Sequence, residues 1–334
     1  CPRSMADRRG GVALLTDPRF SMFSNSFYGV EVHQLPMGRI GGGFKGKLIG
    51  GFQLLHSIGE ARLLLKELQP SVVIGFGGYP SVPGMLAAIW LKCPTMIHEQ
   101  NRLAGRANRL LAKFARKVAS SFPETIGVEP GKVTVVGNPV RAEIQKPEAG
   151  NQKPEIMHLL IFGGSQGARI FSEVVPEAIA RLPEERRAKL RIAQQARSED
   201  GSAVVQRYKE LRVIADIRPF FEDMPDQLAK ANLVICRSGA STVAEMAAAG
   251  KPAIYAPYPH AADDHQRYNA GYMVDHGAGW LLPDAAFTPE SLAAKLTELF
   301  TQPELLESAA RNASALAMPD AAVKLVEMAE GLAQ

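Results

Sequence analysis

The sequence predicts an α/β protein built from two similar halves. Residues 233–256 comprise an apolar strand, a turn of small residues, a short helix that ends at Gly250, and a second apolar strand. Residues 71–98 repeat this order of strand, glycine turn, small-residue helix and strand, and a polar cluster follows each repeat. Duplicated β-α-β units of this kind are typical of parallel sheets.

Length and composition agree with this prediction. A chain of 334 residues is comfortable for two domains, and 46% hydrophobic with 22% charged residues is typical of a soluble globular protein. The net charge of +4 permits an anionic ligand or an acidic membrane surface but does not favour nucleic acid. Cys1, Cys93 and Cys236 are far apart. We therefore expect no disulfide framework, no zinc site and a reducing, cytoplasmic setting.

The first half begins with two short strands, and a helix with amphipathic periodicity follows at 54–68. An α/β domain normally starts with a strand and a Gly-rich loop ahead of its first helix, so we expect that first unit to be missing from this sequence. Further strands are expected in the first half, with a helix at 85–91. The strands of the first half are predicted at residues 12–16, 30–35, 71–75, 94–98 and 133–136.

The second half follows a polar stretch with proline, glycine and lysine, which predicts a linker. We place the N-terminal domain at 1–144, the linker at 145–155 and the C-terminal domain at 156–318. A terminal helix within 319–334 could pack back on the first half. Strands are predicted at 157–162, 191–195, 213–220, 233–236, 252–256 and 279–282, and helices at 243–249, 289–300 and 321–332.

Residues 238–242 join a buried strand to a helix, and such a turn directs backbone N–H groups and a helix dipole at an anion. Glu245 lies one turn into that helix, where a ribose could reach it. Thr242 and Glu245 also match a capping box, which only satisfies backbone donors at a helix start. Polar residues gather after the next strand, at the edge where open α/β sheets bind ligands, and they favour a nucleotide site. These residues are Asp263, Asp264, His265, Gln266 and Asn269.

Two other patterns leave alternatives open. The loop at 163–169 is neither GxGxxG nor a P-loop, and it fits a tight turn as well as an anion site. The segment at 39–53 with the helix at 54–68 fits either a flexible loop and a core-facing helix, or an apolar patch ringed by cations that docks on anionic lipid. The patch would comprise Phe44, Lys45, Lys47, Leu48 and Phe52.

In combination, six segments resemble the MurG glycosyltransferases of peptidoglycan synthesis in order and spacing. The matching segments are 77–84 (GGYPSVPG), 98–101 (HEQN), 137–141 (GNPVR), 163–168 (GGSQGA), 236–245 (CRSGASTVAE) and 264–269 (DHQRYN). The resemblance implies two Rossmann-like domains facing across a cleft, the GT-B fold. It places the nucleotide-sugar donor on the C-terminal domain and the acceptor on the membrane-side N-terminal domain.

The resemblance also implies the reaction. N-acetylglucosamine would pass from UDP-N-acetylglucosamine to the 4-hydroxyl of lipid I with inversion, giving lipid II and UDP, without a cofactor or a tightly bound metal. Asp263 and Asp264 would orient their loop rather than hold an ion. The expected partners are the polyprenyl diphosphate acceptor, an anionic membrane surface and other cell-wall synthesis proteins, at the cytoplasmic face of a bacterial inner membrane. No nucleic acid is expected.

Site residues follow from the matching motifs. On the donor side, Arg141 would lie near the donor, Phe221 would offer backbone to uracil, and Gln266 would bind sugar hydroxyls. The full donor-binding set is Asn101, Arg141, Ser165, Gln166, Gly167, Phe221, Ala240, Ser241, Thr242, Glu245 and Gln266. The acceptor-side set is Gly78, Tyr79, Ser81 and Gly84.

The family carries a Gly-Gly-Thr-Gly-Gly-His loop after its first strand, and this sequence lacks it. His98 and Glu99 are then the nearest candidates for the proton acceptor, although His98 fits a hydrogen-bonded strand-end histidine equally well. Two alternatives remain beside the transferase. One is a non-catalytic or truncated, inactive nucleotide-sugar-binding protein, and the other is a related enzyme such as a glycolipid glycosyltransferase or a nucleotide-sugar epimerase.

Overall fold

A computed structural model describes residues 11–17, 29–35, 44–145, 155–164 and 168–333, and for residues 44–49 it describes the backbone only. The chain divides into two compact units, Cys1–Pro139 with Asp320–Gln334, and Val140–Pro319. The second unit thus starts ahead of the linker predicted at 145–155, most of which lies outside the described residues. No helix in the described ranges has the length and apolar character to cross a membrane.

The described part of the first unit contains a pair of parallel strands, β1 (Ala13–Thr16) and β2 (Glu31–Gln34), and a separate parallel sheet. That sheet has the order β3-β4-β5-β6, so strands that follow one another in sequence are neighbours. Its strands are β3 (Val73–Gly75), β4 (Thr95–Glu99), β5 (Lys117–Ser120) and β6 (Val133–Val135), and the helices of this unit are α2 (Phe44–Leu68), α3 (Ser81–Trp90), α4 (Arg106–Leu111) and α13 (Ala321–Ala333).

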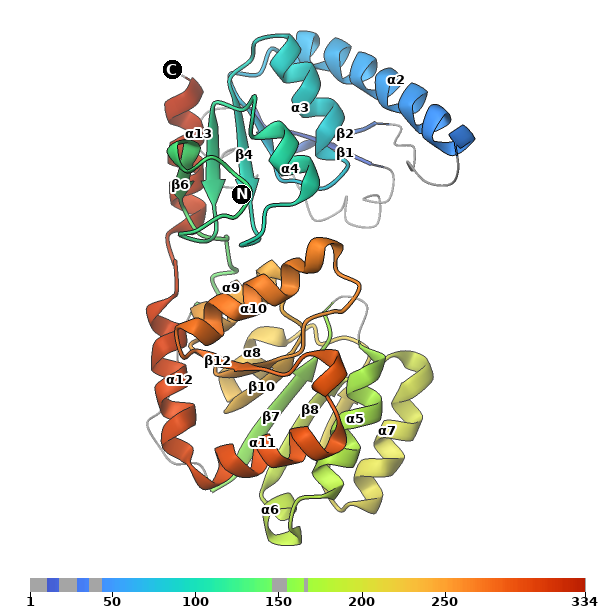
Figure 1. Cartoon of the computed structure of the whole chain (residues 1–334), viewed down its shortest axis with the longest axis vertical. Helices are drawn as coiled ribbons and strands as arrows, with labels where there is room; N and C mark the ends of the chain where they lie inside the picture. The colour runs from blue at the N-terminus through green and yellow to red at the C-terminus, as the bar shows by residue number, and fades with distance from the viewer. Residues whose placement is uncertain (1–10, 18–28, 36–43, 146–154, 165–167, 334) are drawn as a thin grey trace. The chain divides into compact units, whose positions relative to one another are not determined.

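The first unit is packed from apolar faces of these helices. Ala61 and Leu65 of α2 are buried in one cluster with Ala87 and Ala88 of α3. On the sheet, Leu325 and Ala329 of α13 are buried against β4 and β5, and α13 runs beside the sheet in Figure 1. The terminal helix therefore belongs to the first unit although the second unit precedes it in sequence.

The second unit is a parallel sheet whose described strands have the order β12-β11-β10-β7-β8-β9. Strand order 3-2-1-4-5-6 is that of dinucleotide-binding Rossmann folds, counted from β7. Its strands are β7 (Met157–Phe162), β8 (Leu190–Gln195), β9 (Ile214–Arg218), β10 (Leu233–Cys236), β11 (Ala253–Tyr255) and β12 (Gly279–Leu281). The central strands β10 and β11 are buried along their whole length, as their continuous apolar sequences predict.

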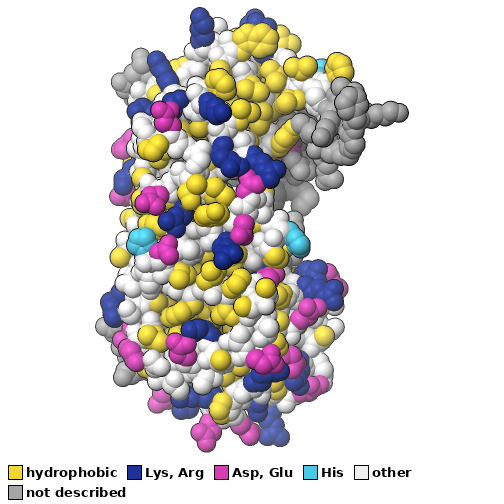
Figure 2. All heavy atoms as spheres, viewed as in Figure 1, with side chains coloured by type: hydrophobic (Ala, Val, Ile, Leu, Met, Phe, Trp, Pro, Cys, Tyr) yellow, Lys and Arg dark blue, Asp and Glu magenta, His cyan; other side chains and the backbone are white. Residues whose placement is uncertain are grey.

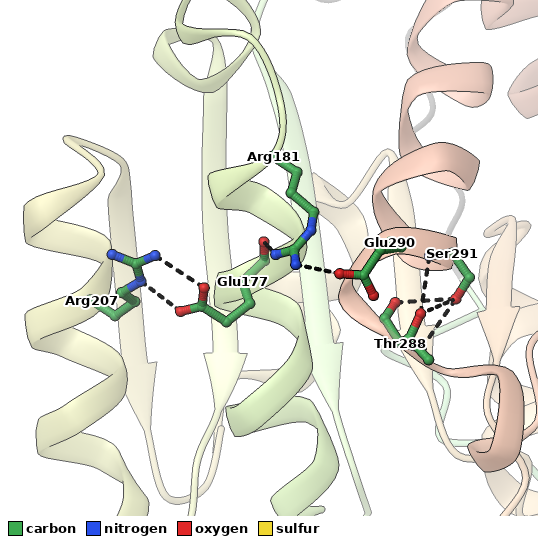
Figure 3. Close-up of polar contacts among 6 residues, drawn as sticks. All are labelled: Glu177, Arg181, Arg207, Thr288, Glu290 and Ser291. Atoms are coloured by element: carbon green, nitrogen blue, oxygen red, sulfur yellow. Dashed lines mark hydrogen bonds and ion pairs between the residues drawn. The ribbon is translucent and has the colours of Figure 1, made fainter.

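Helices cover both faces of this sheet, as Figure 1 shows. The helices are α5 (Arg169–Ala180), α6 (Glu184–Ala188), α7 (Ser198–Glu210), α8 (Met224–Lys230), α9 (Ala240–Ala249), α10 (His265–Asp275), α11 (Pro289–Thr301) and α12 (Pro303–Ala315). Side chains on the exposed surface connect three of them: Arg207 of α7 donates two hydrogen bonds to Glu177 of α5, at 2.7 and 3.0 Å, and Arg181 pairs with Glu290 of α11 (Figure 3). These exposed pairs link α7 to α5, and α11 to Arg181, the residue that follows α5.

Three predictions about elements need correction. The flexible-loop alternative is wrong for residues 44–53, because α2 already begins at Phe44 and includes the glycines of this segment; residues 39–43 lie outside the described part. Helix α3 begins at Ser81 rather than 85, with Pro83 in its first turn, where a proline costs no hydrogen bond. The predicted helices also omit the segment at 265–275, which forms α10.

Candidate functional site

The strand order places the ends of β7 and β10 next to each other at the point where the sheet is wound in opposite directions. In open α/β sheets this switch point is where ligands bind. After β7 the chain turns at Gly164, whose φ of +86° is in the left-handed region, and the N–H of Gly163 donates to Gln195 at 3.0 Å. The predicted phosphate-loop residues Ser165, Gln166 and Gly167 lie outside the described residues.

After β10 the chain enters α9, and the predicted donor residues Ala240, Ser241 and Thr242 form its first turn. Its N-cap residue is Gly239, which has no side chain to cap the helix. The capping-box interpretation of Thr242 and Glu245 is therefore wrong, because Thr242 lies inside the helix. The first backbone N–H groups of a helix have no partner within it, so those at the start of α9 suit an anion.

Glu245 lies on α9 just beyond this first turn, and its side chain is 21% exposed. Among the described residues, its carboxylate meets one cation, Arg141, whose Nη2 is 3.6 Å from Oε1. Burial raises the pKa of Glu245, and Arg141 opposes that rise. Arg141 itself is 55% exposed and stands at the start of the second unit. The pair is loose, so the carboxylate keeps acceptor capacity for a further donor.

The predicted polar cluster is gathered at the same edge. Gln266 Oε1 accepts from the backbone N–H groups of Ser238 at 3.3 Å and Tyr258 at 2.9 Å, and so joins the loops after β10 and β11. Asn269 is buried and donates to the carbonyl of Ser238 at 3.1 Å. With Oε1 taken up by the protein, the side-chain amide of Gln266 offers its Nε2 hydrogens to a ligand.

The turn that delivers Gln266 is conformationally unusual. Asp263 and Asp264 both have left-handed backbone angles, with φ of 53° and 55°, immediately before α10. Aspartate tolerates this region better than most residues do. Their placement agrees with a loop-orienting role, which remains a prediction.

Arg237 is a residue that the sequence interpretation missed. It is buried directly after β10, donates to the carbonyls of Ala256 and Pro257 at 2.9 and 3.0 Å, and pairs with Asp284. Arg237 thus connects the ends of β10 and β11 beneath the candidate site. The sequence did contain a signal for this role, since Arg237 directly follows the apolar strand β10 and a charged residue there needs polar partners. Phe221, the predicted uracil contact, is buried with Arg218 5.3 Å from its ring centroid.

In the first unit, Glu99 is buried at the end of β4 and is surrounded by donors. Its Oε1 accepts from the backbone N–H of Asn101 at 2.8 Å and from Asn101 Nδ2 at 3.2 Å. Its Oε2 accepts from the N–H of Gly105 at 3.0 Å and from Asn108 Nδ2 at 2.8 Å. Both oxygens are occupied, so this arrangement favours a structural role and does not favour Glu99 as a proton acceptor.

His98 is equally committed to the protein. Its Nε2 lies 2.9 Å from the carbonyl of Gly137, which can only accept, so Nε2 carries the proton. Its Nδ1 then accepts from Gln100 Nε2 at 3.2 Å. Burial lowers the pKa of His98, and the hydrogen bond to Gly137 and the charge of Glu99 oppose this. A neutral imidazole with both nitrogens hydrogen-bonded to the protein favours the interpretation of His98 as a structural histidine at a strand end over a catalytic role.

The predicted acceptor-side residues follow β3. Gly77 and Gly78 have φ of +82° and +71°, and Ser81 Oγ donates to the carbonyl of Gly78 at 3.0 Å. Gln100 Nε2 donates to the carbonyl of Phe76 at 3.0 Å, which ties this turn to the end of β4. Tyr79 is 40% exposed on the turn, whereas Gly84 lies buried in α3.

Comparisons with known proteins agree with this architecture. The description "Glycosyltransferase family 28 N-terminal domain" matches residues 4–120, and "Glycosyltransferase family 28 C-terminal domain" matches residues 158–325. A transferase of Rhodospirillum centenum is 44% identical over 99% of this chain and 89% of its own length, and one of Paramagnetospirillum magneticum is 46% identical over 98% and 91%. Both are named UDP-N-acetylglucosamine--N-acetylmuramyl-(pentapeptide) pyrophosphoryl-undecaprenol N-acetylglucosamine transferase. The crystal structure of MurG from Acinetobacter baumannii superimposes with a TM-score of 0.81 at 31% identity, covering 98% of this chain and 93% of that one.

Two parallel α/β units, with a ligand edge at the switch point of the second, define a glycosyltransferase of the GT-B class. Within that class, the chain belongs to the MurG family of N-acetylglucosamine transferases.

Proposed function

We propose that this chain transfers N-acetylglucosamine from UDP-N-acetylglucosamine to the 4-hydroxyl of lipid I, with inversion, and so forms lipid II. The names of its relatives support the substrates, and one structural observation supports the donor site. Glu245 is a largely buried carboxylate at the Rossmann switch point, and Arg141 holds it only loosely. A ribose diol would supply the two hydroxyl donors that this carboxylate can accept.

The other donor groups extend from Glu245. The first turn of α9 suits the diphosphate, since its N–H groups and helix dipole favour negative charge. Gln266 Nε2 suits the sugar hydroxyls, because its Oε1 is held by two backbone amides and its orientation is therefore fixed. Ser165, Gln166 and Gly167 complete the proposed phosphate site, and Phe221 with Asn101 completes the proposed donor set.

The test is paired on this chain. UDP-N-acetylglucosamine binding is measured by calorimetry, and transfer to a lipid I analogue is then measured on the same preparation. Binding with transfer supports the proposal. Binding without transfer favours the non-catalytic alternative, and no binding by the folded chain refutes the donor site. UDP-glucose as preferred donor, or diacylglycerol as acceptor, would identify the glycolipid enzyme instead.

The identity of the proton acceptor belongs to the same proposal. The contacts of His98 and Glu99 support a role in the protein interior over contact with a substrate hydroxyl. We propose that they shape the acceptor side, together with the turn at Gly78, Tyr79 and Ser81. An inverting displacement still needs a group that accepts the proton and donors that stabilise the departing UDP.

We also propose that the first unit binds an anionic membrane surface through the outer stripe of α2, which comprises Phe52, Leu55 and Leu63. These side chains are 72%, 67% and 70% exposed, and their helical spacing places them on one side of α2. Next to them, Arg62 lies 4.6 Å from the ring centroid of Trp90, which is 65% exposed. Apolar groups beside a cation suit the interface of anionic lipid.

The remaining predicted patch residues, Phe44, Lys45, Lys47 and Leu48, have helical backbone in α2, and their side chains are outside the described part. Figure 2 shows exposed apolar side chains over the first unit, in the region that Figure 1 assigns to α2 and α3. Contacts with other cell-wall synthesis proteins remain a prediction without structural support.

Metal independence is a further part of the proposal. Within the described residues, no three His, Cys, Asp or Glu side chains gather in a manner suited to a metal ion. The cationic Arg141 and the first turn of α9 would instead offset the charge of the departing diphosphate. Transfer is therefore expected to continue in the presence of a chelator, and complete loss that added Mg²⁺ restores would contradict this.

A further inference from the structure

Arg141 and Glu245 are the two charged residues that the proposed donor site assigns to neighbouring parts of its ligand, the diphosphate and the ribose, and in the structure they contact each other. The contact is 3.6 Å between Nη2 and Oε1, with 55% of the Arg141 side chain and 21% of the Glu245 side chain exposed. Both belong to the second unit, so the contact is internal to it. A ligand that places its ribose at Glu245 and its diphosphate at Arg141 would compete with this contact for both side chains.

We propose that Arg141 makes diphosphate binding conditional on a ribose. In the ligand-free protein Arg141 is held by the Glu245 carboxylate, and it is released to the diphosphate when a ribose diol takes over that carboxylate. This inference rests on the proposed donor site and deepens it. Arg141 thereby becomes a specificity-determining residue, which discriminates nucleoside diphosphates from diphosphates that lack a ribose.

The distances along α9 permit the exchange. Glu245 is five residues after Ala240, the first residue of the helix, and at about 1.5 Å of rise per residue the two are roughly 7.5 Å apart along the axis. That span is within the length of a flexible arginine side chain. More than half of the Arg141 side chain is exposed, which leaves it room to change position.

The burial of Glu245 gives the exchange its direction. A largely buried carboxylate without a partner is costly, so the ligand-free protein retains Arg141 against it. The hydroxyls of a ribose replace that partner by direct hydrogen bonds, whereas inorganic pyrophosphate cannot replace it. Pyrophosphate must therefore break the ion pair and leave Glu245 buried with no donor, and its binding is weakened.

In the proposed reaction, this mechanism would prevent the acceptor from occupying the donor site. The acceptor of that reaction is itself a diphosphate, carried on a polyprenyl chain and without a nucleoside. A donor site that bound any diphosphate would be inhibited by its own acceptor. A penalty against the wrong ligand is a common route to specificity, since discrimination depends on the difference between two affinities.

The experiment measures calorimetric binding of UDP, uridine and inorganic pyrophosphate to the wild type and to Glu245→Gln and Arg141→Gln. In Glu245→Gln we expect UDP to bind at least about tenfold more weakly and pyrophosphate about two- to fivefold more tightly, the effect of removing a half-exposed ion pair. In Arg141→Gln we expect UDP and pyrophosphate to weaken while uridine binds as well as before or more tightly. Arg181→Gln removes a comparable pair with Glu290, remote from the site, and serves as the matched control.

The outcomes separate the two proposals. No binding of UDP to the wild type overturns the donor site itself. If UDP binds but Glu245→Gln leaves pyrophosphate affinity unchanged or lowers it, the donor site stands and the conditional role of Arg141 is overturned. Failure of pyrophosphate to bind either protein also overturns that role. Circular dichroism spectra of all variants must match the wild type, and Arg141→Lys should restore part of the UDP affinity.

Discussion

Glu99 and His98 lie at the sheet edge where ligands commonly bind, but their hydrogen bonds connect parts of the protein. Both follow from the sequence as site candidates, since they end a buried strand at the carboxyl edge of a sheet. Their hydrogen bonds reach the start of α4 and the loop after β6, and Gln100, which donates to His98, also donates to the turn after β3. Each carboxylate oxygen of Glu99 accepts two hydrogen bonds from the protein, and this indicates a structural role.

Glu99→Gln tests this structural role. The change places an amide N–H group against existing donors, so the free energy of unfolding should fall by about 2–3 kcal/mol. The measurement is chemical denaturation, and Glu124→Gln is the control because its side chain is 80% exposed at a 3.4 Å pair with Arg102. The control should change stability by less than about 0.5 kcal/mol. Equal effects of both variants would contradict the structural role.

His98 should make the first unit less stable in acid. Because burial lowers its pKa below the ordinary 6.5, the unfolded chain binds a proton at a pH where the folded chain does not. The contribution is complete above about pH 6.5 and is lost as pH falls below that value towards the folded pKa. Trp90 fluorescence in a Trp280→Phe background follows the first unit, since these are the two tryptophans of the chain. In His98→Gln the slope between pH 7 and 5 should flatten, and an unchanged slope would refute the assignment.

At the scale of secondary structure, the distance between neighbouring elements can require a particular residue. Gly279 is an example, because its neighbours leave no space for a side chain. Gly279 begins β12 against β11, and a Cβ there would lie 2.4 Å from the carbonyl oxygen of Ala253 and 2.8 Å from the ring of Tyr255. The outer stripe of α2 shows the opposite situation, apolar side chains that the described protein leaves exposed. Gly279 therefore leaves no room for a side chain, whereas the outer stripe of α2 is not covered by any described part of the protein.

Gly279→Ala should therefore destabilise the second unit by about 3 kcal/mol, because backbone cannot move aside as a flexible side chain can. Thermal unfolding monitored by Trp280 fluorescence is the measurement. Gly201→Ala is the control within the same unit, since a Cβ at Gly201, in the first turn of α7, meets nothing within 4 Å. That control should be neutral or stabilising by up to about 1 kcal/mol. Similar losses in both variants would refute the close-approach argument.

The outer stripe of α2 is tested with vesicles that contain phosphatidylglycerol. The double variant Leu55→Ser and Leu63→Ser removes two exposed leucines, and the partition coefficient should fall at least about tenfold. Ile214→Ser is the matched control, because Ile214 is 62% exposed on β9 of the second unit. Vesicle binding by the double variant at the level of the wild type would contradict the proposed membrane surface.

For the whole molecule, the division into two units predicts that the nucleotide of the donor substrate stabilises only the unit that binds it. UDP at about 100 times its dissociation constant should stabilise the second unit by about 2.7 kcal/mol. Trp280 fluorescence in a Trp90→Phe background should shift to higher temperature, whereas the Trp90 signal of the complementary variant should move little. Glu245→Gln should reduce this stabilisation to about 1.4 kcal/mol or less at the same UDP concentration, as a loss of at least tenfold in UDP affinity requires. Stabilisation of the first unit alone would contradict the assignment of the donor site.

The sequence by itself determined the α/β class, most strands and the family, and it predicted which sheet edge binds the donor. It did so because buried parallel strands are continuous apolar runs, as in β7 and β10, and both were predicted with the bounds observed. Helix starts were less certain: α2 and α3 begin earlier than predicted, because glycine and proline are tolerated where packing or a first turn permits them. The Rossmann strand order could not follow from the sequence, since it depends on which strands pair.

Only the tertiary structure decided the roles of individual side chains. It showed Gly239, not Thr242, at the start of α9, and it surrounded Glu99 with donors from residues up to nine positions away. It assigned the missed Arg237 to carbonyls 19 and 20 residues further on, and it brought Arg141 against Glu245. A hydrogen bond or ion pair depends on distance and direction in space, and local sequence patterns do not specify which distant groups come within reach.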